Sequence, residues 1–393
     1  MPPKNRQQRQ IEKAHRATAG EHRPWFDRRI VLFVVALKVF MLAFGAAAYV
    51  ILTNQSAGSF QGWLELWNRW DVPHYIDIAR DGYVATDLVS KDQRLWIVFY
   101  PLYPWLLRLF GIVLRDYVLS FHVVSLIGSV AAGLLFYRLA RLDLEDRLAR
   151  AAVFFMFVFP TAYFFHTGYT ESVFMPLVFG SLLAARKERW ALAGALGALA
   201  ALTRVNGMLL IPVLAVEAFM QYRRDGRTLR REWLWILLTS VGFLVYLSIN
   251  YSVWGDAFYF QKVMEKYWYK KLTWPWVGIG GTLEAAWTRD PAEAHLVGVQ
   301  EFFFITLGAA CTVWAWRRLR PSYAVWMTLN WLLVTSTSHV MSTPRYTLSM
   351  FPIFLLFAQL AEARPNWGAA VTVWSLTFLG IFTALFVQGH WAF

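Results

Sequence analysis

Long apolar stretches recur along this chain of 393 residues, and each approaches the length of a membrane-crossing helix. A helix needs about 20 predominantly apolar residues to cross the hydrocarbon core of a bilayer. The share of charged residues, 16%, is also well below the roughly 25% of soluble domains. We therefore predict an all-α polytopic membrane protein with about 11 transmembrane helices. The predicted spans lie at about 30–52, 117–137, 151–166, 171–186, 190–203, 205–222, 233–253, 299–316, 322–338, 345–361 and 368–388.

Basic residues gather in short segments between these runs, which is the pattern of cytoplasmic loops. The segments are the N-terminus, 138–150, "RKER" (186–189), "YRRDGRTLRR" (222–231) and "RRLR" (317–320). All of these segments lie on the cytoplasmic side if the segment 95–115 does not cross the membrane. That segment contains two prolines and Arg108. The N-terminus is then cytoplasmic and the C-terminus is outside. Because these loops account for most of the net charge of +13, we expect contact with membrane lipids and no binding of nucleic acid.

The chain is predicted to hold one membrane domain. We expect residues 1–29 to form a basic cytoplasmic tail that is retained, and 30–393 to form a single transmembrane domain. Two long segments then face away from the cytoplasm, at about 53–116 and 254–298. The long basic N-terminus and short loops favour a bacterial plasma membrane. The single cysteine, Cys311, lies within a predicted span, so the sequence has no cysteine pattern for a metal or a disulfide.

"RWDVPHYIDIARDGY" (69–83) concentrates titratable side chains directly after the first span. Proline is favoured at the start of a helix, so we predict a helix from about Pro73 to Arg80 that stops at Gly82. Asp71 lies at the break before this helix. In one interpretation the Asp71 carboxylate simply caps the helix. In the other it has a chemical role, which would account for the neighbouring His74.

The helix spacing places His74, Asp77 and Asp81 on one face of this predicted helix. A carboxylate near a helix N-terminus stays ionised at neutral pH. It accepts a proton from an alcohol only late, when the oxygen is already bonding to an electrophile. An anomeric carbon with a lipid phosphate as leaving group suits this chemistry. We expect His74 to help hold the phosphate, the indoles of Trp67 and Trp70 to lie against a sugar or prenyl chain, and Asp77 and Asp81 to be structural.

Five stretches, in the same order, resemble conserved blocks of the glycosylphosphatidylinositol mannosyltransferase II (PIG-V-like) family. "WDVPHYIDIARDGY" (70–83) is similar to its W-D-x-x-H block, and "FPTAYFFHTGYTESVF" (159–174) to its Y-[TS]-E-S block. "FYPLYPWLLR" (99–108), "ALTRVNGMLL" (201–210) and "STPRY" (342–346) resemble its F-[FY]-P-L-Y-P, T-R-[SP]-x-G and S-x-P-R-[YF] blocks. Ala257 replaces the proline of a further family block, W-G-D-P.

The resemblance implies a GT-C type fold and an inverting glycosyltransferase with an extracytoplasmic active site. It implies a polyprenyl-phosphate-mannose donor, Asp71 as the catalytic carboxylate, and no metal or other cofactor. The expected catalytic residues are therefore Asp71 and His74. The expected substrate-binding residues are Trp70, Tyr169, Glu171, Arg204, Asn206, Asp256, Arg345 and Tyr346.

Each of these binding residues also has a structural interpretation. Glu171 suits a first helical turn for electrostatic reasons alone, but would also contact an acceptor hydroxyl or sugar opposite Asp71. Arg204 and Arg345 are costly near a bilayer, which favours contact with a phosphate oxygen pair. Asn206 lies in the same short turn as Arg204. Asp256 either caps a helix or contacts the acceptor.

Other functional classes remain open at this stage. A transporter or flippase of lipid-linked sugars would also need aromatic residues and arginines. Transporters, however, place charges at the membrane midplane and contain inverted repeats, and no repeat is visible here. A non-catalytic subunit with the same fold is a further alternative, and glucose or arabinose would fit the same type of carrier. The sequence does not identify the acceptor.

Overall fold

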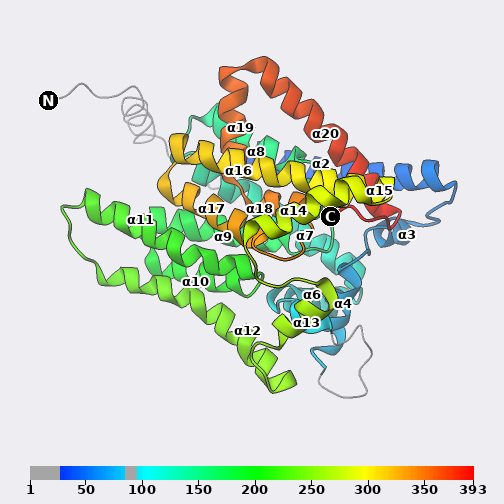
Figure 1. The fold of residues 1–393 in the computed structure, drawn as a ribbon, viewed down its shortest axis with the longest axis horizontal. Helices are drawn as coiled ribbons and strands as arrows, with labels where there is room; N and C mark the ends of the chain where they lie inside the picture. Colours follow the sequence, from blue (N-terminus) through cyan, green and yellow to red (C-terminus); the bar gives the residue numbers. More distant parts are fainter. Residues whose placement is uncertain (1–26, 85–94) are drawn as a thin grey trace.

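The computed structural model describes residues 27–84 and 95–393 of the chain. Most of the predicted tail (1–29) and part of the first external segment (53–116) therefore lie outside the described residues. The described residues form helices and connecting segments, with one isolated β-bridge between Leu272 and Thr337. Figure 1 shows the arrangement of the helices: α11 (Leu210–Arg224) ends at the left, whereas α3 (Phe60–Glu65) and α4 (Val72–Asp81) lie at the right.

The other elements of the first half are α2 (Arg28–Thr53), η1 (Trp96–Val98), α6 (Leu102–Leu114), α7 (Tyr117–Ala140), α8 (Asp146–Val158), η2 (Ala162–Phe165), α9 (Glu171–Arg186), α10 (Trp190–Ala201) and η3 (Val205–Leu209). Those of the second half are η4 (Arg231–Leu238), α12 (Thr239–Trp254), α13 (Tyr259–Trp268), α14 (Pro275–Thr288), α15 (Pro291–Glu293), η5 (Ala294–Gln300), α16 (Glu301–Arg318), α17 (Pro321–Thr335), α18 (Thr343–Ser349), α19 (Pro352–Ala363) and α20 (Pro365–Val387).

Six helical segments among the described residues are long and apolar enough to cross a membrane, and the number rises to seven if the bent pair α18–α19 is one span. The chain is therefore an integral membrane protein. The expected number of about 11 spans is not confirmed. Four of the predicted runs form helices of only 12 to 16 residues, which are shorter than a full crossing. These runs are 151–166, 171–186, 190–203 and 322–338.

The predicted span 345–361 is not one straight helix. Its two parts, α18 and α19, meet at an angle of 80°. Pro352 begins α19, and because it has no N–H it cannot continue the hydrogen-bond ladder of α18. Met350 leaves the helical conformation just before it, with φ −81° and ψ 54°. The bend leaves α18 as a short helix that carries Arg345.

The segment 95–115 was predicted not to cross the membrane. Its main helix, α6, has 13 residues and is therefore about 20 Å long, less than the bilayer core. Arg115 ends it in the left-handed conformation, and Asp116 then caps α7 through the amide of Leu119 at 2.9 Å. α6 packs against α4 and α7, and the absence of a crossing here stays a prediction.

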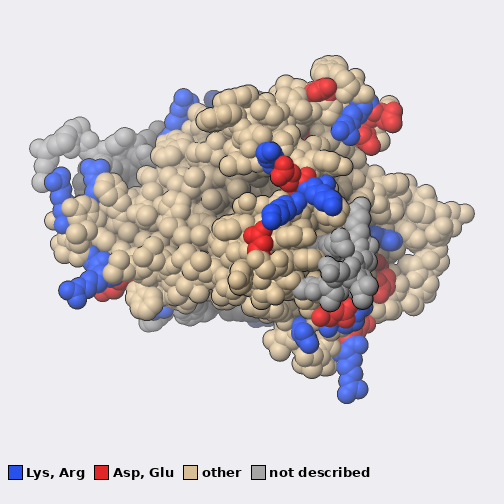
Figure 2. Space-filling model, turned by 60° about the horizontal axis from the view of Figure 1, so that its bottom comes forward, with Lys and Arg blue, Asp and Glu red and all other residues tan. Residues whose placement is uncertain are grey.

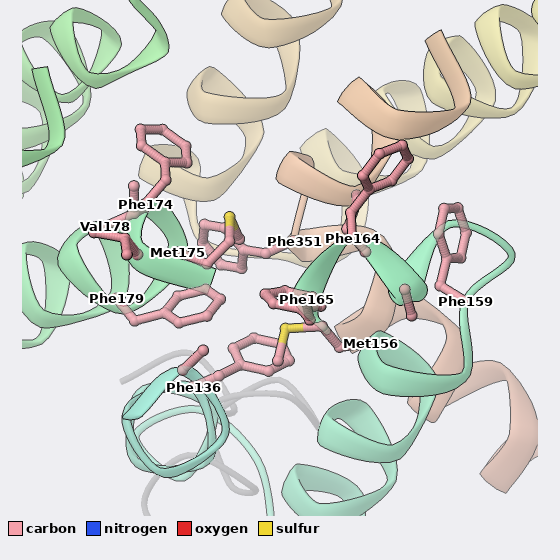
Figure 3. Close-up of a cluster of buried hydrophobic side chains, with 14 of the residues drawn as sticks. Phe136, Met156, Phe159, Phe164, Phe165, Phe174, Met175, Val178, Phe179 and Phe351 are labelled. Carbon is pink, nitrogen blue, oxygen red and sulfur yellow. The ribbon is translucent and has the colours of Figure 1, made fainter. Parts of the chain in front are cut away.

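The hydrophobic core lies where α7, α8, α9 and α18–α19 meet, and Figure 3 shows its aromatic and methionine side chains. Phe136 of α7 stacks on Phe179 of α9 with ring centroids 4.8 Å apart, and Phe351 lies edge-on to both. A Cβ at Gly128 would come within 2.2 Å of the Ser172 carbonyl oxygen. This contact brings the N-terminus of α9, where Glu171 lies, close against α7.

Charged side chains are sparse on the surface. On the face drawn in Figure 2, Lys, Arg, Asp and Glu side chains gather in small groups and leave broad areas without charge. Lys38 is a buried exception within α2. Its ammonium donates to the Ser125 hydroxyl at 2.7 Å, to the His166 carbonyl at 2.7 Å and to the His122 carbonyl at 3.4 Å. Lys38 is thus paired with neutral oxygens and joins α2 to α7 and to the segment before α9.

Candidate active site

Asp71 occupies the N-cap position of α4, but its side chain forms no capping hydrogen bond. The chain turns sharply before it, because Trp70 has a positive φ of 57°. The Asp71 carboxylate instead contacts the guanidinium of Arg345, with Oδ2 and Nη1 3.2 Å apart, and the Asp71 side chain is 34% exposed. Its amide donates to the Tyr169 hydroxyl at 3.3 Å. The capping interpretation therefore does not explain this carboxylate.

Glu171, the first residue of α9, is fully buried and bound by two arginines. Arg345 donates through Nε to Glu171 Oε1 at 2.7 Å, and its Nη2 lies 3.5 Å from Oε2. Arg204 donates through Nη1 to the same carboxylate, and also to the Thr170 hydroxyl at 3.3 Å. Arg345 thereby bridges Asp71 and Glu171. Buried charges of this kind are stable only as a paired set.

Aromatic rings surround both arginines. The guanidinium carbon of Arg345 lies 4.3 Å from the centre of the Tyr169 ring and 4.9 Å from that of Phe164. Arg204 lies 5.2 Å from the Tyr346 ring. Burial and the nearby Asp71 carboxylate raise the pKa of Tyr169 well above its usual range, so this residue stays a neutral phenol. The rings favour the cations electrostatically and hold them in place.

The segment 159–170 brings the separate sequence blocks together. Thr167 donates to the Trp67 carbonyl at 3.1 Å, just before Asp71. Thr161 donates to the Pro344 carbonyl at 2.9 Å, just before Arg345. A Cβ at Gly168 would lie 2.5 Å from Val72 Cγ1, so only glycine allows α4 to approach this closely. Blocks that lie far apart in the sequence thus meet around one carboxylate–arginine cluster, formed by Asp71, Glu171, Arg204 and Arg345.

His74 and Trp70 flank the cluster without contacting it. His74 is almost one turn along α4, and its ring stacks on Phe99 with centroids 5.4 Å apart. The indole N–H of Trp70 donates to the His390 carbonyl at 3.2 Å, and its ring meets Trp391 edge-on at 5.2 Å. The C-terminal segment therefore covers Trp70, although 42% of this residue remains exposed. Trp67 is fully buried beside Phe386 of α20, so its indole is a core side chain and does not reach a substrate.

Two other expected binding residues have partners elsewhere. Asn206 is buried and donates to the Asn330 side-chain oxygen at 2.8 Å, which joins η3 to α17. Asp256 accepts from the amide of Phe258 at 2.9 Å and pairs with Lys262 at 2.7 Å. The Asp256 carboxylate thus supports the turn that leads into α13. Neither residue contacts the carboxylate–arginine cluster.

Asp77 and Asp81, which we expect to be structural, share one partner. Both pair with Arg80, at 2.8 and 2.9 Å. The hydrogen bond from Arg80 lowers the pKa of Asp81. α4 ends at Gly82 with a φ of 78°, which confirms the predicted stop.

Lys270 is a neighbour of the site, and the sequence singles out only the stretch 253–271 around it, as an interfacial helix or a guide for lipid substrates. Its ammonium lies 5.5 Å from the centre of the Tyr346 ring. It belongs to the aromatic and basic stretch that follows α12, and nothing in that pattern distinguishes it from Lys271. Among residues 27–84 and 95–393, no three His, Cys, Asp or Glu side chains are grouped as a metal ion would require. The expectation of transfer without a metal stays a prediction.

Comparison with known proteins supports the resemblance of the sequence blocks. Residues 100–252, less than half of the chain, match the family model of the dolichyl-phosphate-mannose-protein mannosyltransferases. The chain is 26% identical over 208 residues to the GPI alpha-1,6-mannosyltransferase 2 of Mus musculus. This alignment covers 46% of the chain and 41% of the mouse protein.

Solved structures similar to the chain include the oligosaccharyltransferase of Archaeoglobus fulgidus. Its complex with zinc and sulfate matches with a TM-score of 0.45 and 14% identity, over 90% of this chain and 53% of that one. The complex with an inhibitory peptide and a dolichol-phosphate has the same TM-score and identity, over 91% and 55%. The chain thus spans about half the length of the structures and about two fifths of the curated relative that it matches. The predicted resemblance to membrane mannosyltransferases is confirmed, over part of the chain.

Proposed function

We propose that this protein is an inverting mannosyltransferase of the GT-C type, located in a bacterial plasma membrane with its N-terminus in the cytoplasm. It transfers mannose from a polyprenyl-phosphate carrier to a hydroxyl of an acceptor on the extracytoplasmic side. The observation that carries this proposal is the position of Asp71. Its carboxylate lies at a helix break, is partly exposed, and is held by Arg345 instead of capping α4.

In the proposed reaction the acceptor oxygen attacks the anomeric carbon from the face opposite the carrier phosphate. The bond between that carbon and the phosphate oxygen breaks, and the lipid phosphate leaves with the bonding electrons. The proton of the acceptor hydroxyl passes to Asp71 as the new bond forms. The Arg345 guanidinium, 3.2 Å from Asp71, holds the carboxylate in place for this transfer. Proton transfer is late, because the acceptor hydroxyl becomes acidic enough only as its oxygen bonds to the anomeric carbon.

The buried Glu171 positions the two arginines. Because it neutralises charge on both Arg204 and Arg345, it lets two guanidinium groups lie near the reacting carboxylate. His74 stays a proposed contact for the carrier phosphate, and Tyr346 a proposed contact for the sugar. Asn206 and Asp256 bond to Asn330 and Lys262, so we propose that they support the binding site from outside the carboxylate–arginine cluster.

The test is transfer of radiolabelled mannose from polyprenyl-phosphate-mannose, with purified protein and a membrane extract as the source of acceptor. A general base contributes about 10²- to 10⁴-fold to a rate, so Asp71→Asn should lose activity by that factor while it still folds. Asp77→Asn is the matched control, because Asp77 lies on the same helix and pairs with Arg80. Near-native turnover of Asp71→Asn would refute the mechanism.

Other donors and a flux assay separate the alternatives. Carriers that bear glucose or arabinose test the identity of the sugar. Movement of a lipid-linked sugar across a vesicle membrane without a labelled product would indicate a transporter.

A further inference from the structure

Both arginines of the carboxylate–arginine cluster are already bonded to carboxylates. Arg345 uses Nε and Nη2 on Glu171 and Nη1 on Asp71. Arg204 uses Nη1 on Glu171. A phosphate that entered this cluster would compete with Asp71 and Glu171 for the donors of Arg345, and only Arg204 keeps donors, on Nε and Nη2, without a partner among the described residues. The cluster pairs two guanidinium groups with two carboxylates and so has no formal net charge, which means that a further cation beside it is needed to bind a lipid phosphate.

Lys270 meets this requirement. Its ammonium lies over the Tyr346 ring, and Arg204 approaches the same ring at 5.2 Å. Of the other lysines in this stretch, Lys262 pairs with Asp256 and Lys271 with Glu265, whereas Lys266 lies over the Tyr267 ring, away from Tyr346. Within the part of the chain that the structure describes, Lys270 has no carboxylate oxygen within ion-pair distance.

One buried acid, Glu301, interacts with Lys270 only through space, and its carboxyl oxygens have other partners. They accept hydrogen bonds from the amides of Ser342 at 2.5 Å and Thr343 at 2.7 Å. The N–H donors of Lys270 are therefore available to a ligand.

The backbone holds Lys270 at this position. Its amide donates to the Met264 carbonyl at 3.2 Å, which closes the end of α13. On either side, Ser338 accepts from the Lys271 amide at 2.9 Å and donates to the Tyr269 carbonyl at 2.7 Å. The stretch after α13 is thus bonded to the loop that leads to α18 and Arg345.

Exposed apolar side chains follow Lys270 directly. Leu272 is 85% exposed and Trp274 68% exposed, and Trp274 stacks on Trp276 with ring centroids 5.1 Å apart. Adjacent exposed apolar side chains of this size mark a surface that contacts apolar groups. Aromatic residues beside a cation suit the boundary between lipid headgroups and hydrocarbon.

We propose that Lys270, Leu272 and Trp274 form a docking site for the phosphate-bearing end of a polyprenyl carrier. The Lys270 ammonium binds the phosphate at the edge of the cluster, and the two apolar side chains contact the first prenyl units. The identification of this lipid as the sugar donor rests on the proposed function. The phosphate contact itself does not.

Binding of polyprenyl phosphate, without a sugar, to the purified full-length chain in detergent tests the site. A hydrogen bond between charged groups is lost in Lys270→Met, so the Kd should rise about tenfold or more, whereas Lys270→Arg should bind nearly as well as the unaltered protein. Lys271→Met is the matched control, since this neighbour pairs with Glu265, and its Kd should not change. An unchanged Kd for Lys270→Met, or an equal rise for Lys271→Met, would overturn the proposal.

Competition distinguishes the sources of phosphate. Leu272→Ser should weaken binding of polyprenyl phosphate, and inorganic phosphate should compete only poorly with the lipid. Equal competition by inorganic phosphate would refute a lipid site, and equal competition by phosphatidylglycerol would refute a carrier site.

The transfer assay separates the two proposals. If the unaltered chain transfers mannose, Lys270→Met should raise the KM for the donor more than it lowers kcat. If the unaltered chain transfers no mannose but its binding of polyprenyl phosphate depends on Lys270, the proposed function fails and the docking site stands.

Discussion

Replacement of Glu171 by Gln keeps the shape of the side chain and removes the charge that two buried arginines share. At 2.7 Å and an effective dielectric constant of about 20, a pair of unit charges such as Arg345 and Glu171 attracts by about 6 kcal/mol before desolvation is counted. Desolvation offsets much of this attraction, and breaking a buried ion pair costs about 3–5 kcal/mol in measured cases. Arg345 keeps Asp71 as a partner at 3.2 Å, whereas Arg204 loses its only ion pair among the described residues.

We therefore expect Glu171→Gln to lower the free energy of unfolding by about 3–5 kcal/mol, mainly through Arg204. Denaturant unfolding in detergent micelles measures this loss. A double-mutant cycle gives the decisive comparison, because Arg204→Met combined with Glu171→Gln leaves no unpaired charge at this position. The double variant should be more stable than Glu171→Gln alone.

Two results would refute this reasoning. One is a Glu171→Gln protein within about 1 kcal/mol of the unaltered chain, which would mean that the arginines gain little from the carboxylate. The other is a double variant whose loss equals the sum of the two single losses, since independent sites behave in that way. Either result would mean that the carboxylate–arginine cluster is not an energetic unit.

Two further predictions follow from the same geometry. Gly168→Ala places a Cβ 2.5 Å from Val72 Cγ1, so it should lower the free energy of unfolding by about 1–3 kcal/mol and lower kcat by displacing the start of α4. Val72→Ala in the same chain should restore both quantities, and failure of this rescue would show that the contact is unimportant. Arg345→Lys keeps the charge but loses the planar guanidinium that reaches two carboxylates, so the rate of mannose transfer should fall at least tenfold. Normal activity of this variant would show that the charge alone suffices.

The local features of the site were predictable from the sequence because they depend on neighbouring residues. Pro73 and Gly82 determine where α4 begins and ends, so the break at Asp71 was visible in advance. Apolar runs predicted a membrane protein, since burial in lipid requires them whatever the packing.

The number of crossings was less predictable, because an apolar run has no fixed helical length. α9 has 16 residues and α10 has 12, although their sequences are as apolar as those of longer spans. α9 is almost entirely buried by other parts of the protein, whereas Leu192 and Leu199 of α10 are exposed, so composition alone does not determine where such helices end.

Only the tertiary structure decided which of the polar residues act together. Arg345 contacts Asp71 across 274 positions of sequence, and Asn206 pairs with Asn330 across 124. Lys270 and Lys271 are equivalent in the sequence, yet only Lys270 lies over Tyr346. Hydrophobic periodicity predicts which residues are buried, but the partner of a buried charge depends on which helix faces meet. The sequence by itself therefore determined the chemistry available to this protein, and the packing of the segment 159–170 against α4 and α18 decided which side chains are brought together to perform it.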